Sequence, residues 1–163
     1  MLIGLISDTH NQVARTYRAL RTFQNLGVKA ILHCGDLTRP QVAQTLITKD
    51  IPTYFVYGNN DDSDELEYNL KLFGGIDLKY SGIITLGDRR IGMAHGDRLA
   101  HMQKLAAAEP DYLFFGHSHV ATDFQQGPTR FVNPGALHRA PKWTYVTLDL
   151  ATGEIQWHEI KED

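Results

Sequence analysis

The sequence is poor in cysteine, in long apolar runs and in net charge, and each shortage excludes a class of protein. A single cysteine, Cys34, cannot form an internal disulfide and fits a reducing compartment. No apolar run approaches the roughly 20 residues of a membrane span, and the start of the chain lacks the basic region of a signal peptide. The formal net charge of −3 gives no basic excess typical of nucleic-acid binding. We therefore expect a cytoplasmic protein with no membrane partner and no strong nucleic-acid signal, although the fold could still form a local basic patch.

The 163 residues suit one domain with a hydrophobic core, and we expect residues 1–163 to form it. In the first third, strand and helix patterns alternate. Apolar runs predict strands at 2–6, 29–33 and 53–57, and helical spacing predicts helices at 11–26 and 40–48. This alternation indicates a parallel sheet with crossover helices.

The rest of the chain is richer in strands. Helices are expected at 63–73 and 99–108, and strands at 83–86, 90–94, 112–115, 121–125, 129–132, 143–149 and 154–160. The first two of these strands read as a hairpin around Gly87 and Asp88. Two packed sheets with helices on the outside would satisfy both halves of the sequence.

Polar side chains that can bind metal recur just after the predicted strands. They are Asp8, His10, Asp36, Asn59, His95, His117 and His119. Ligands of α/β sheets bind at the carboxyl ends of strands, so these side chains are expected to converge. Glycines beside them (Gly35, Gly58, Gly96 and Gly116) would permit tight turns and close approach of the backbone.

Taken singly, each of these residues could be a helix cap or a turn former. Together they offer oxygen and imidazole ligands in a number that exceeds what one catalytic ion uses. Two divalent ions that share a carboxylate would account for the set. Ligation by nitrogen and oxygen without thiolate suits manganese first, with iron, zinc, nickel or cobalt as alternatives.

The motifs resemble those of the calcineurin-like metallophosphoesterases, and in particular their compact bacterial and archaeal phosphodiesterase branch. The matching segments are Asp8-Thr-His10, Gly35-Asp36, Gly58-Asn59-Asn60-Asp61, His95-Gly96 and Gly116-His-Ser-His119, in the order of the family. The resemblance implies an α/β fold: a four-layer αββα sandwich of two mixed sheets flanked by helices.

The resemblance also implies roles for individual residues. Asp8, His10 and His119 would hold one metal ion, and Asn59, His95 and His117 the other. Asp36 would bridge the two ions, and a hydroxide held between them would attack phosphorus in line. Asn60 and Asp61 would be the candidate catalytic residues next to the ions.

The sequence departs from the family at two places. Asn60 stands where many members have a histidine assigned to phosphate contact or leaving-group protonation, and an amide cannot act as an acid near neutral pH. We therefore expect a preference for activated phosphodiesters. Asp97 stands where a second histidine is common, and Asp61 matches an acidic position that could orient its neighbours.

Several residues keep two interpretations. Arg39 and Arg98 could meet phosphate but are more simply exposed surface residues. Asn133-Pro-Gly135 resembles a turn near the family's site, although turn chemistry alone would explain it. The remaining histidines are expected to be structural or exposed, and two methionines to pack in the core: His33, His101, His138, His158, Met93 and Met102.

The expected substrate is a small phosphoester, chosen by rim segments near 63–80 and 97–103. A phosphomonoesterase of the same fold and a non-catalytic protein-interaction scaffold are the alternatives. A nuclease would be expected to carry added domains and basic charge. A homo-oligomer, dimer or tetramer, is plausible because relatives often form one.

Overall fold

The computed structural model describes residues 1–161 as a succession of strands and helices close to the expected one. The helices are α1 (Val13–Asn25), α2 (Pro40–Leu46), α3 (Ser63–Phe73) and α4 (Leu99–Ala107). The strands are β1 (Leu2–Ile6), β2 (Ile31–His33), β3 (Thr53–Phe55), β4 (Ile76–Asp77), β5 (Ser81–Leu86), β6 (Arg89–Ala94), β7 (Tyr112–Phe114), β8 (Thr122–Gln126), β9 (Thr129–Asn133), β10 (Trp143–Asp149) and β11 (Ile155–Ile160).

Local chemistry sets several helix ends. Pro40 opens α2, where its missing N–H and fixed φ suit a helix start. Asp62 caps α3 by accepting hydrogen bonds from the amides of Asp64 and Glu65, both at 3.1 Å. Gly74 ends the same helix in a left-handed conformation, with φ of 86°.

The strands form two mixed sheets. The first sheet has the order β11-β10-β1-β2-β3-β4, and the second has the order β5-β6-β7-β9-β8. Strands β1 to β4 run parallel, and so do β6, β7 and β9. The loops that follow β1, β2 and β3 therefore leave one edge of the first sheet, and those that follow β6 and β7 leave one edge of the second.

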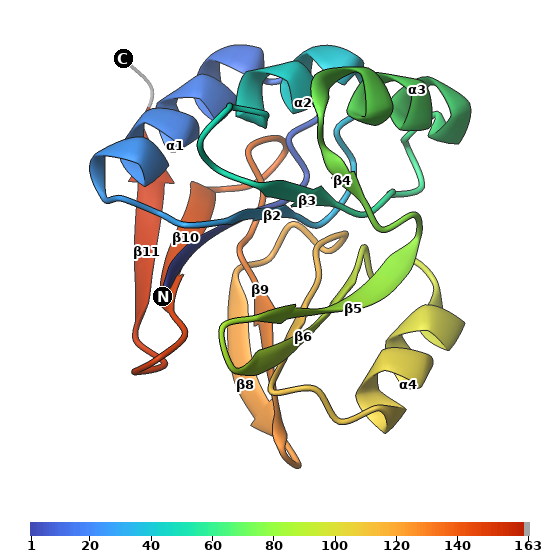
Figure 1. Ribbon diagram of the computed structural model, residues 1–163, viewed down its shortest axis with the longest axis vertical. Coiled ribbons are helices and arrows are strands. Elements are labelled where there is room, and N and C mark those ends of the chain that lie inside the picture. The colour runs from blue at the N-terminus through green and yellow to red at the C-terminus, as the bar shows by residue number, and fades with distance from the viewer. Residues whose placement is uncertain (162–163) are drawn as a thin grey trace.

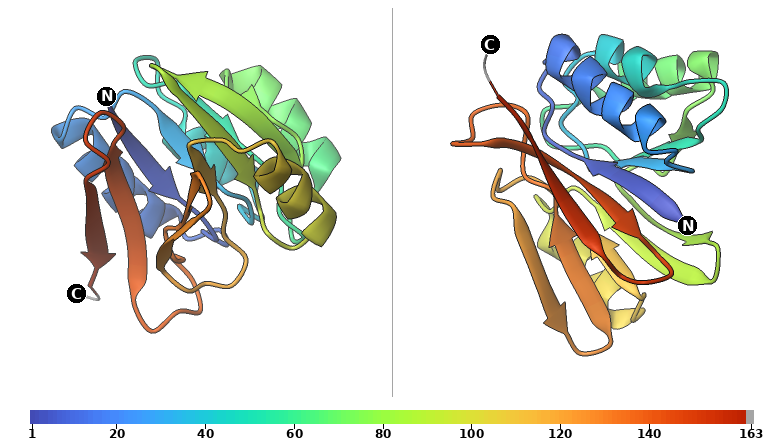
Figure 2. Two further views of the ribbon diagram at one scale, coloured as in Figure 1. Left: turned by 90° about the horizontal axis from the view of Figure 1, so that it is seen from below. Right: turned by 90° about the vertical axis from the view of Figure 1, so that its left-hand side faces the viewer.

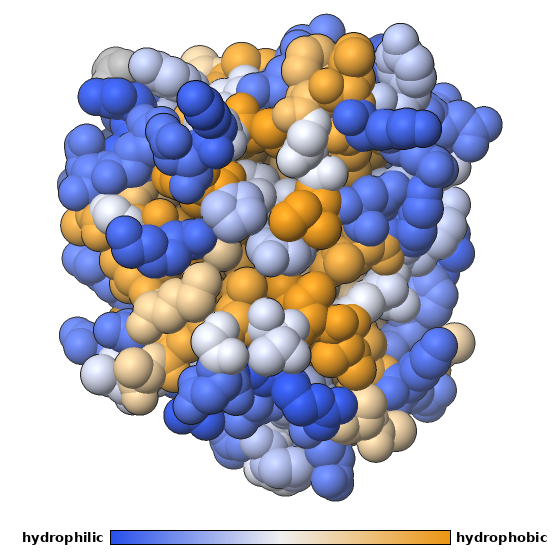
Figure 3. All heavy atoms as spheres, in the orientation of Figure 1, coloured by the Kyte–Doolittle hydropathy of each residue, from blue (hydrophilic) through white to orange (hydrophobic). Residues whose placement is uncertain are grey.

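The sheets pack face to face between two helical layers. Figure 1 shows α1, α2 and α3 over the first sheet and α4 beside the second, and Figure 2 shows the same layers from two other sides. Three clusters of buried apolar side chains fill the spaces between the layers; Phe23, Phe114 and Leu105 are members of the first, second and third. On the face in Figure 3, apolar side chains gather near the centre, with hydrophilic ones around them.

This architecture confirms the predicted αββα sandwich, and the differences are local. Helix α1 begins at Val13 rather than at residue 11, because Asn11 takes a left-handed conformation (φ 58°) in the loop after His10. Strand β4 was not predicted, since its 2 residues are too few to show alternation; it pairs in parallel with β3. Over residues 1–161, none of the helices is long and apolar enough to cross a membrane.

Candidate active site

The predicted ligands lie on short loops that are joined to one another by backbone hydrogen bonds. The amide of Asp8 donates to the carbonyl of Gly35 at 3.0 Å, and the amide of His10 donates to that of Asp36 at 3.0 Å. In the second sheet, the amide of Gly116 donates to the carbonyl of His95 at 2.8 Å. The loops after neighbouring strands are thus fixed in position relative to each other before any side chain is considered.

The backbone of these loops is strained at the proposed ligands. Left-handed φ values occur at Asp8 (50°), His10 (40°), Asp36 (58°), His117 (67°) and His119 (59°). Residues other than glycine adopt this region rarely, and such strain concentrates at functional sites. Here the left-handed values fall on five of the seven proposed ligands.

Two glycines allow the loops to meet. A Cβ atom on Gly58 would collide with the carboxylate and amide of Asp36, and one on Gly116 would collide with the side chains of Ser7 and Asp8. Glycine is therefore required at both positions for steric reasons. Such a close approach of the backbone is what the sequence predicts at these two glycines.

The first group of side chains surrounds Asp8, which is fully buried. Nε2 of His119 lies 3.2 Å from Oδ1 of Asp8, and the rings of His10 and His119 are 5.2 Å apart. The other carboxylate oxygen, Oδ2, accepts hydrogen bonds from the Ser7 hydroxyl (2.6 Å) and the His117 amide (3.0 Å). Oδ1 is therefore the oxygen left for a metal ion.

The second group surrounds Asp36. Nε2 of His10 and Nε2 of His95 each lie 3.4 Å from Oδ2 of Asp36, and Nε2 of His95 is 4.0 Å from Oδ1 of Asp8. The His117 ring is 5.1 Å from that of His95, and its Nδ1 lies 3.1 Å from Oδ1 of Asn59. The structure thus brings all seven predicted ligands into one cluster, in which Asp36 touches residues of both groups.

The atoms of this cluster fit divalent metal ions. Oδ1 of Asp8 and Nε2 of His10 and His95 are buried and have no hydrogen-bond partner. Nδ1 of His95 lies 2.7 Å from the carbonyl of Cys34, so in the neutral ring Nε2 presents a lone pair to two carboxylates. Ligand atoms that share an ion at about 2.0–2.2 Å are about 3–3.5 Å apart, which matches these contacts.

The electrostatics of the cluster favour cations. Burial raises the pKa of Asp8, whereas the His95 ring and the Asn60 amides outweigh burial and hold the pKa of Asp36 below its usual range. The two carboxylates raise the pKa of His95 to about 9 against the effect of burial. Burial lowers the pKa of His10 to about 4, which keeps it neutral and able to bind a metal.

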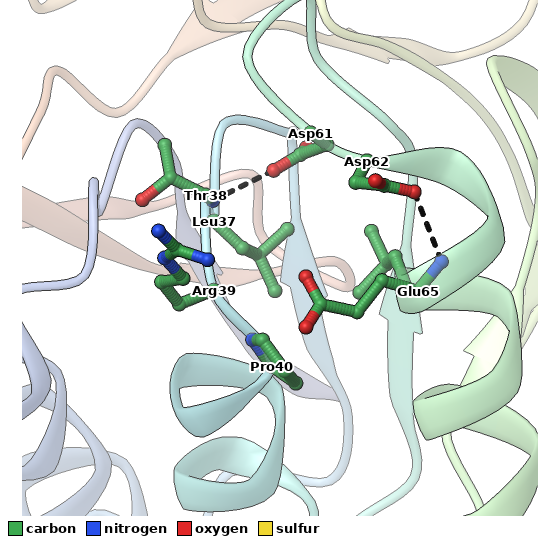
Figure 4. A pocket seen from close by; sticks show the side chains of 8 residues that line it. Leu37, Thr38, Arg39, Pro40, Asp61, Asp62 and Glu65 are labelled. Atoms are coloured by element: carbon green, nitrogen blue, oxygen red, sulfur yellow. Dashed lines mark hydrogen bonds between the residues drawn. The ribbon is translucent and has the colours of Figure 1, made fainter.

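Asn60 and Asp61 both contact this cluster, in different ways. Asn60 donates from its backbone amide (2.9 Å) and its side-chain amide (2.8 Å) to the two oxygens of Asp36. Asp61 accepts from the amides of Asp36 and Gly58 at 2.8 Å and from that of Thr38 at 2.7 Å, as Figure 4 shows for Thr38. Asp61 therefore joins the loops after β2 and β3, and a catalytic role for either residue stays a prediction.

The two arginines with open roles lie at the rim. The Arg98 guanidinium is 4.2 Å above the Tyr80 ring, and its Nε is 3.6 Å from Asp97. The segments 63–80 and 97–103, which are expected to form the rim of the site, are therefore in contact. Arg39 is exposed at the start of α2, where it lines a small pocket with Glu65 (Figure 4).

Sequence reasoning underrated three positions that the fold brings to the site. Nδ2 of the buried Asn133 donates to the Gly116 carbonyl at 2.9 Å and to the Ser118 hydroxyl at 3.1 Å, so it supports the loop of His117 beyond its own turn. The His138 ring lies 5.0 Å from that of His10. The carbonyl of Arg139 lies 3.4 Å from Nδ1 of His119. In the sequence, only the resemblance of Asn133-Pro-Gly135 to a turn near the family's site pointed to any of these positions.

The other histidines lie where the sequence placed them. His33 is a buried strand residue; its Nδ1 accepts from the Gly35 amide at 3.1 Å, and its Nε2 is 3.0 Å from the Thr9 hydroxyl. His158 stacks on Tyr145 in the first sheet. Met93 is buried in the core, as expected, and the half-buried Met102 packs against the third core cluster.

Comparison with known proteins shows which family and fold the chain resembles. A family model described as the calcineurin-like phosphoesterase superfamily domain matches residues 1–153. A phosphodiesterase of Methanocaldococcus jannaschii is 25% identical over 143 residues, which are 83% of each chain. A probable metallophosphoesterase of Methanothermobacter thermautotrophicus is 30% identical over 145 residues, 83% of this chain and 77% of the other. The solved structure of an archaeal phosphodiesterase superposes with a TM-score of 0.89 at 23% identity, covering 98% of this chain and 100% of that one.

Proposed function

Because the chain belongs to the calcineurin-like phosphoesterase superfamily, we propose that it is a dinuclear metal-dependent phosphoester hydrolase that prefers phosphodiesters. The observation that carries the proposal is the group of buried ligand atoms without partners, Oδ1 of Asp8 and Nε2 of His10 and His95. The Methanocaldococcus jannaschii relative, a phosphodiesterase, supports the preference for diesters. A small substrate, a location in the cytoplasm and assembly into a dimer or tetramer belong to the same proposal.

The cluster would hold two ions in the division that the family suggests. The first ion would be held by Asp8, His10 and His119. The second would be held by Asn59, His95 and His117. Asp36 would contribute to both sites. Manganese is the first expectation, and iron, zinc, nickel or cobalt suit the same oxygen and nitrogen ligands. When bound, such ions supply an activated water as nucleophile and positive charge for the phosphoryl oxygens.

The protein's own contribution is to orient the ligands. The Cys34 carbonyl fixes His95 through Nδ1, the Arg139 carbonyl does so for His119, and the Ser7 hydroxyl fixes one oxygen of Asp8. A hydrogen bond to the far side of a ligand sets its tautomer and direction. These contacts hold three of the proposed ligands in position in the folded chain.

The preference for diesters follows from Asn60. Its side-chain amide donates to Asp36, and an amide does not supply a proton to a leaving group near neutral pH. Esters with good leaving groups need no such acid. Phosphomonoester hydrolysis would use the same cluster with weaker leaving-group assistance, whereas a purely protein-binding scaffold would not need the cluster.

The test is hydrolysis of bis-p-nitrophenyl phosphate beside p-nitrophenyl phosphate. Protein stripped with a chelator would be assayed alone and after addition of Mn²⁺, Ni²⁺, Zn²⁺ or Mg²⁺. We expect metal to restore cleavage of the diester well above that of the monoester. A protein that stayed inactive with every metal would favour the scaffold, and a faster monoester would reverse the substrate preference.

Asn60→His tests the missing acid separately. The variant places an imidazole beside the cluster, so the ratio of monoester to diester hydrolysis should rise about tenfold. Asn60→Gln, which changes the side chain without adding an acid, is the matched control. An unchanged ratio in Asn60→His would show that a side chain at this position does not reach the leaving group.

A further inference from the structure

The loop at residues 137–139 borders the proposed metal cluster without contributing a ligand. The amide of the buried Leu137 donates to the Asp8 carbonyl at 3.2 Å. Two residues later, the Arg139 carbonyl lies 3.4 Å from Nδ1 of His119. Backbone groups at both ends of this loop therefore contact residues that would hold the first ion.

Arg15 fixes the loop from the helical side. Its Nη1 donates to the Leu137 carbonyl at 2.7 Å, and its guanidinium carbon lies 3.2 Å above the Trp143 ring. The position of the loop is thus set by backbone groups and by a side chain from α1. The Arg139 side chain forms no hydrogen bond or ion pair with the described residues.

Arg139 is a cation in an unusual backbone conformation. Its φ is 45°, a left-handed value that is rare for a residue other than glycine. It is exposed, and among residues 1–161 no carboxylate forms an ion pair with it. Strain of this kind at the edge of a site is a reason to look for a function.

His138 adds a second donor to the same loop. Its ring lies 5.0 Å from that of His10, and the Gln12 side-chain amide donates to its Nδ1 at 3.5 Å. In the neutral ring the proton is then on Nε2, which has no partner among the described residues. The loop therefore presents an N–H and a guanidinium, donors that suit the oxygens of an anion.

We propose that His138 and Arg139 bind a second anionic group on the substrate, and that the substrate class is a phosphodiester whose retained substituent carries a further phosphate. The inference rests on the proposed function, because it takes the cluster as the site of the scissile phosphate. A guanidinium binds a phosphate through two parallel hydrogen bonds, and the backbone carbonyl of Arg139 lies next to His119.

The experiment compares two esters that differ by one phosphate. Thymidine 5′-(p-nitrophenyl phosphate) and its 3′-phosphorylated form share the scissile bond and the leaving group. We expect the metal-loaded protein to hydrolyse the 3′-phosphorylated ester with a kcat/KM higher by about tenfold. Arg139→Gln should abolish this preference, so that the two esters are hydrolysed by the variant with kcat/KM values within about twofold of each other. Arg21→Gln on α1, which removes the same charge away from the site, should keep the preference.

Two further readouts decide between outcomes. Calorimetry should show thymidine 3′,5′-bisphosphate binding more tightly than thymidine 5′-phosphate to the protein but not to Arg139→Gln. His138→Phe, which keeps the ring beside His10 and removes its donor, should reduce the preference. Equal rates for both esters in the unmodified protein, or an equal loss on both in Arg139→Gln, would overturn the proposal. Bis-p-nitrophenyl phosphate, with no second phosphate, tests the proposed function independently.

Discussion

At the scale of single residues, Asp36 contacts a histidine from each of the two proposed ligand sets. Each of its two oxygens accepts a hydrogen bond from Asn60, and one of them also faces Nε2 of His10 and of His95 at 3.4 Å. Both of the expected ions would therefore depend on this carboxylate. A change of one atom there tests the whole assignment.

Asp36→Asn should abolish activity. The amide keeps the shape of the side chain, but it removes the bridging charge. Its NH₂ group would replace a carboxylate oxygen that faces either the Asn60 amides or the histidine nitrogens. We expect hydrolysis of bis-p-nitrophenyl phosphate to fall at least about a hundredfold and bound metal, measured by mass spectrometry, to drop. Asp88→Asn, in the exposed turn between β5 and β6, is the control. Full metal content and turnover in Asp36→Asn would show that Asp36 does not bridge.

His33 predicts a pH dependence of stability. Burial lowers its pKa to about 3, from 6.5 in the unfolded chain. Between these pH values the unfolded chain binds more protons than the folded one, so the free energy of unfolding decreases as pH falls from 6.5 toward 3. At pH 5 the loss from this one residue is about 2 kcal/mol relative to pH 7.5.

Urea denaturation at pH 5 and pH 7.5 measures this effect. His33→Gln removes the titrating ring, so the difference in unfolding free energy between the two pH values should shrink by about 2 kcal/mol. The stability of the variant at a single pH does not matter for this comparison. An unchanged difference would mean that His33 does not titrate as a buried neutral histidine.

At the scale of elements, the site depends on how closely the loops after the parallel strands approach. The loop of Gly116, after β7 in the second sheet, packs on Ser7 and Asp8, after β1 in the first. The Asn133 side chain supports the same loop from the end of β9. No single strand or loop builds the cluster, because each contributes ligands that another element orients.

Gly116→Ala should separate these loops. The added methyl group would overlap the Ser7 and Asp8 side chains, and the loops must move apart to relieve the overlap. We expect metal content and activity to be lost, with a destabilisation of about 1–3 kcal/mol by denaturant unfolding. Gly92→Ala in β6 is the control, since its new Cβ would lie at an ordinary 3.4 Å from Pro110. An active Gly116→Ala protein would contradict this account of the site.

At the scale of the whole molecule, the proposed ions would connect the two sheets. Asp8, His10, Asp36 and Asn59 follow strands of the first sheet, and His95, His117 and His119 follow strands of the second. A ligand that binds only the folded chain stabilises it by mass action. Metal bound here would therefore resist separation of the sheets as well as support catalysis.

Chelation should lower the Tm of the protein. At a free metal concentration about 100 times the Kd, binding adds about 2.7 kcal/mol of stability, which for a chain of this length corresponds to roughly 5–10 °C. Scanning calorimetry of chelator-treated protein, before and after addition of Mn²⁺, measures the change. Asp36→Asn serves as the comparison, because its Tm should respond little to metal. A Tm indifferent to metal in the unmodified protein would argue against ions shared between the sheets.

The sequence by itself determined the elements and the residue types of the proposed site. Periodicity within each segment placed nearly every strand and helix, because burial on one face leaves a local pattern. The position of Asp8, His10, Asp36 and the other proposed ligands just after strands was also visible, since it depends only on local order along the chain. Strand β4, with 2 residues, lay below what such patterns detect.

Only the tertiary structure decided which loops meet and what supports them. The contact between the His117 amide and Asp8 joins residues 109 positions apart, and the pairing of β10 with β1 joins the two ends of the chain. The contact of Asp61 with the loop of Asp36, and the places of Asn133, His138 and Arg139 beside the cluster, follow from such long-range packing. Local sequence patterns do not encode this packing. It depends on how the two sheets stack and on which loops can approach each glycine closely.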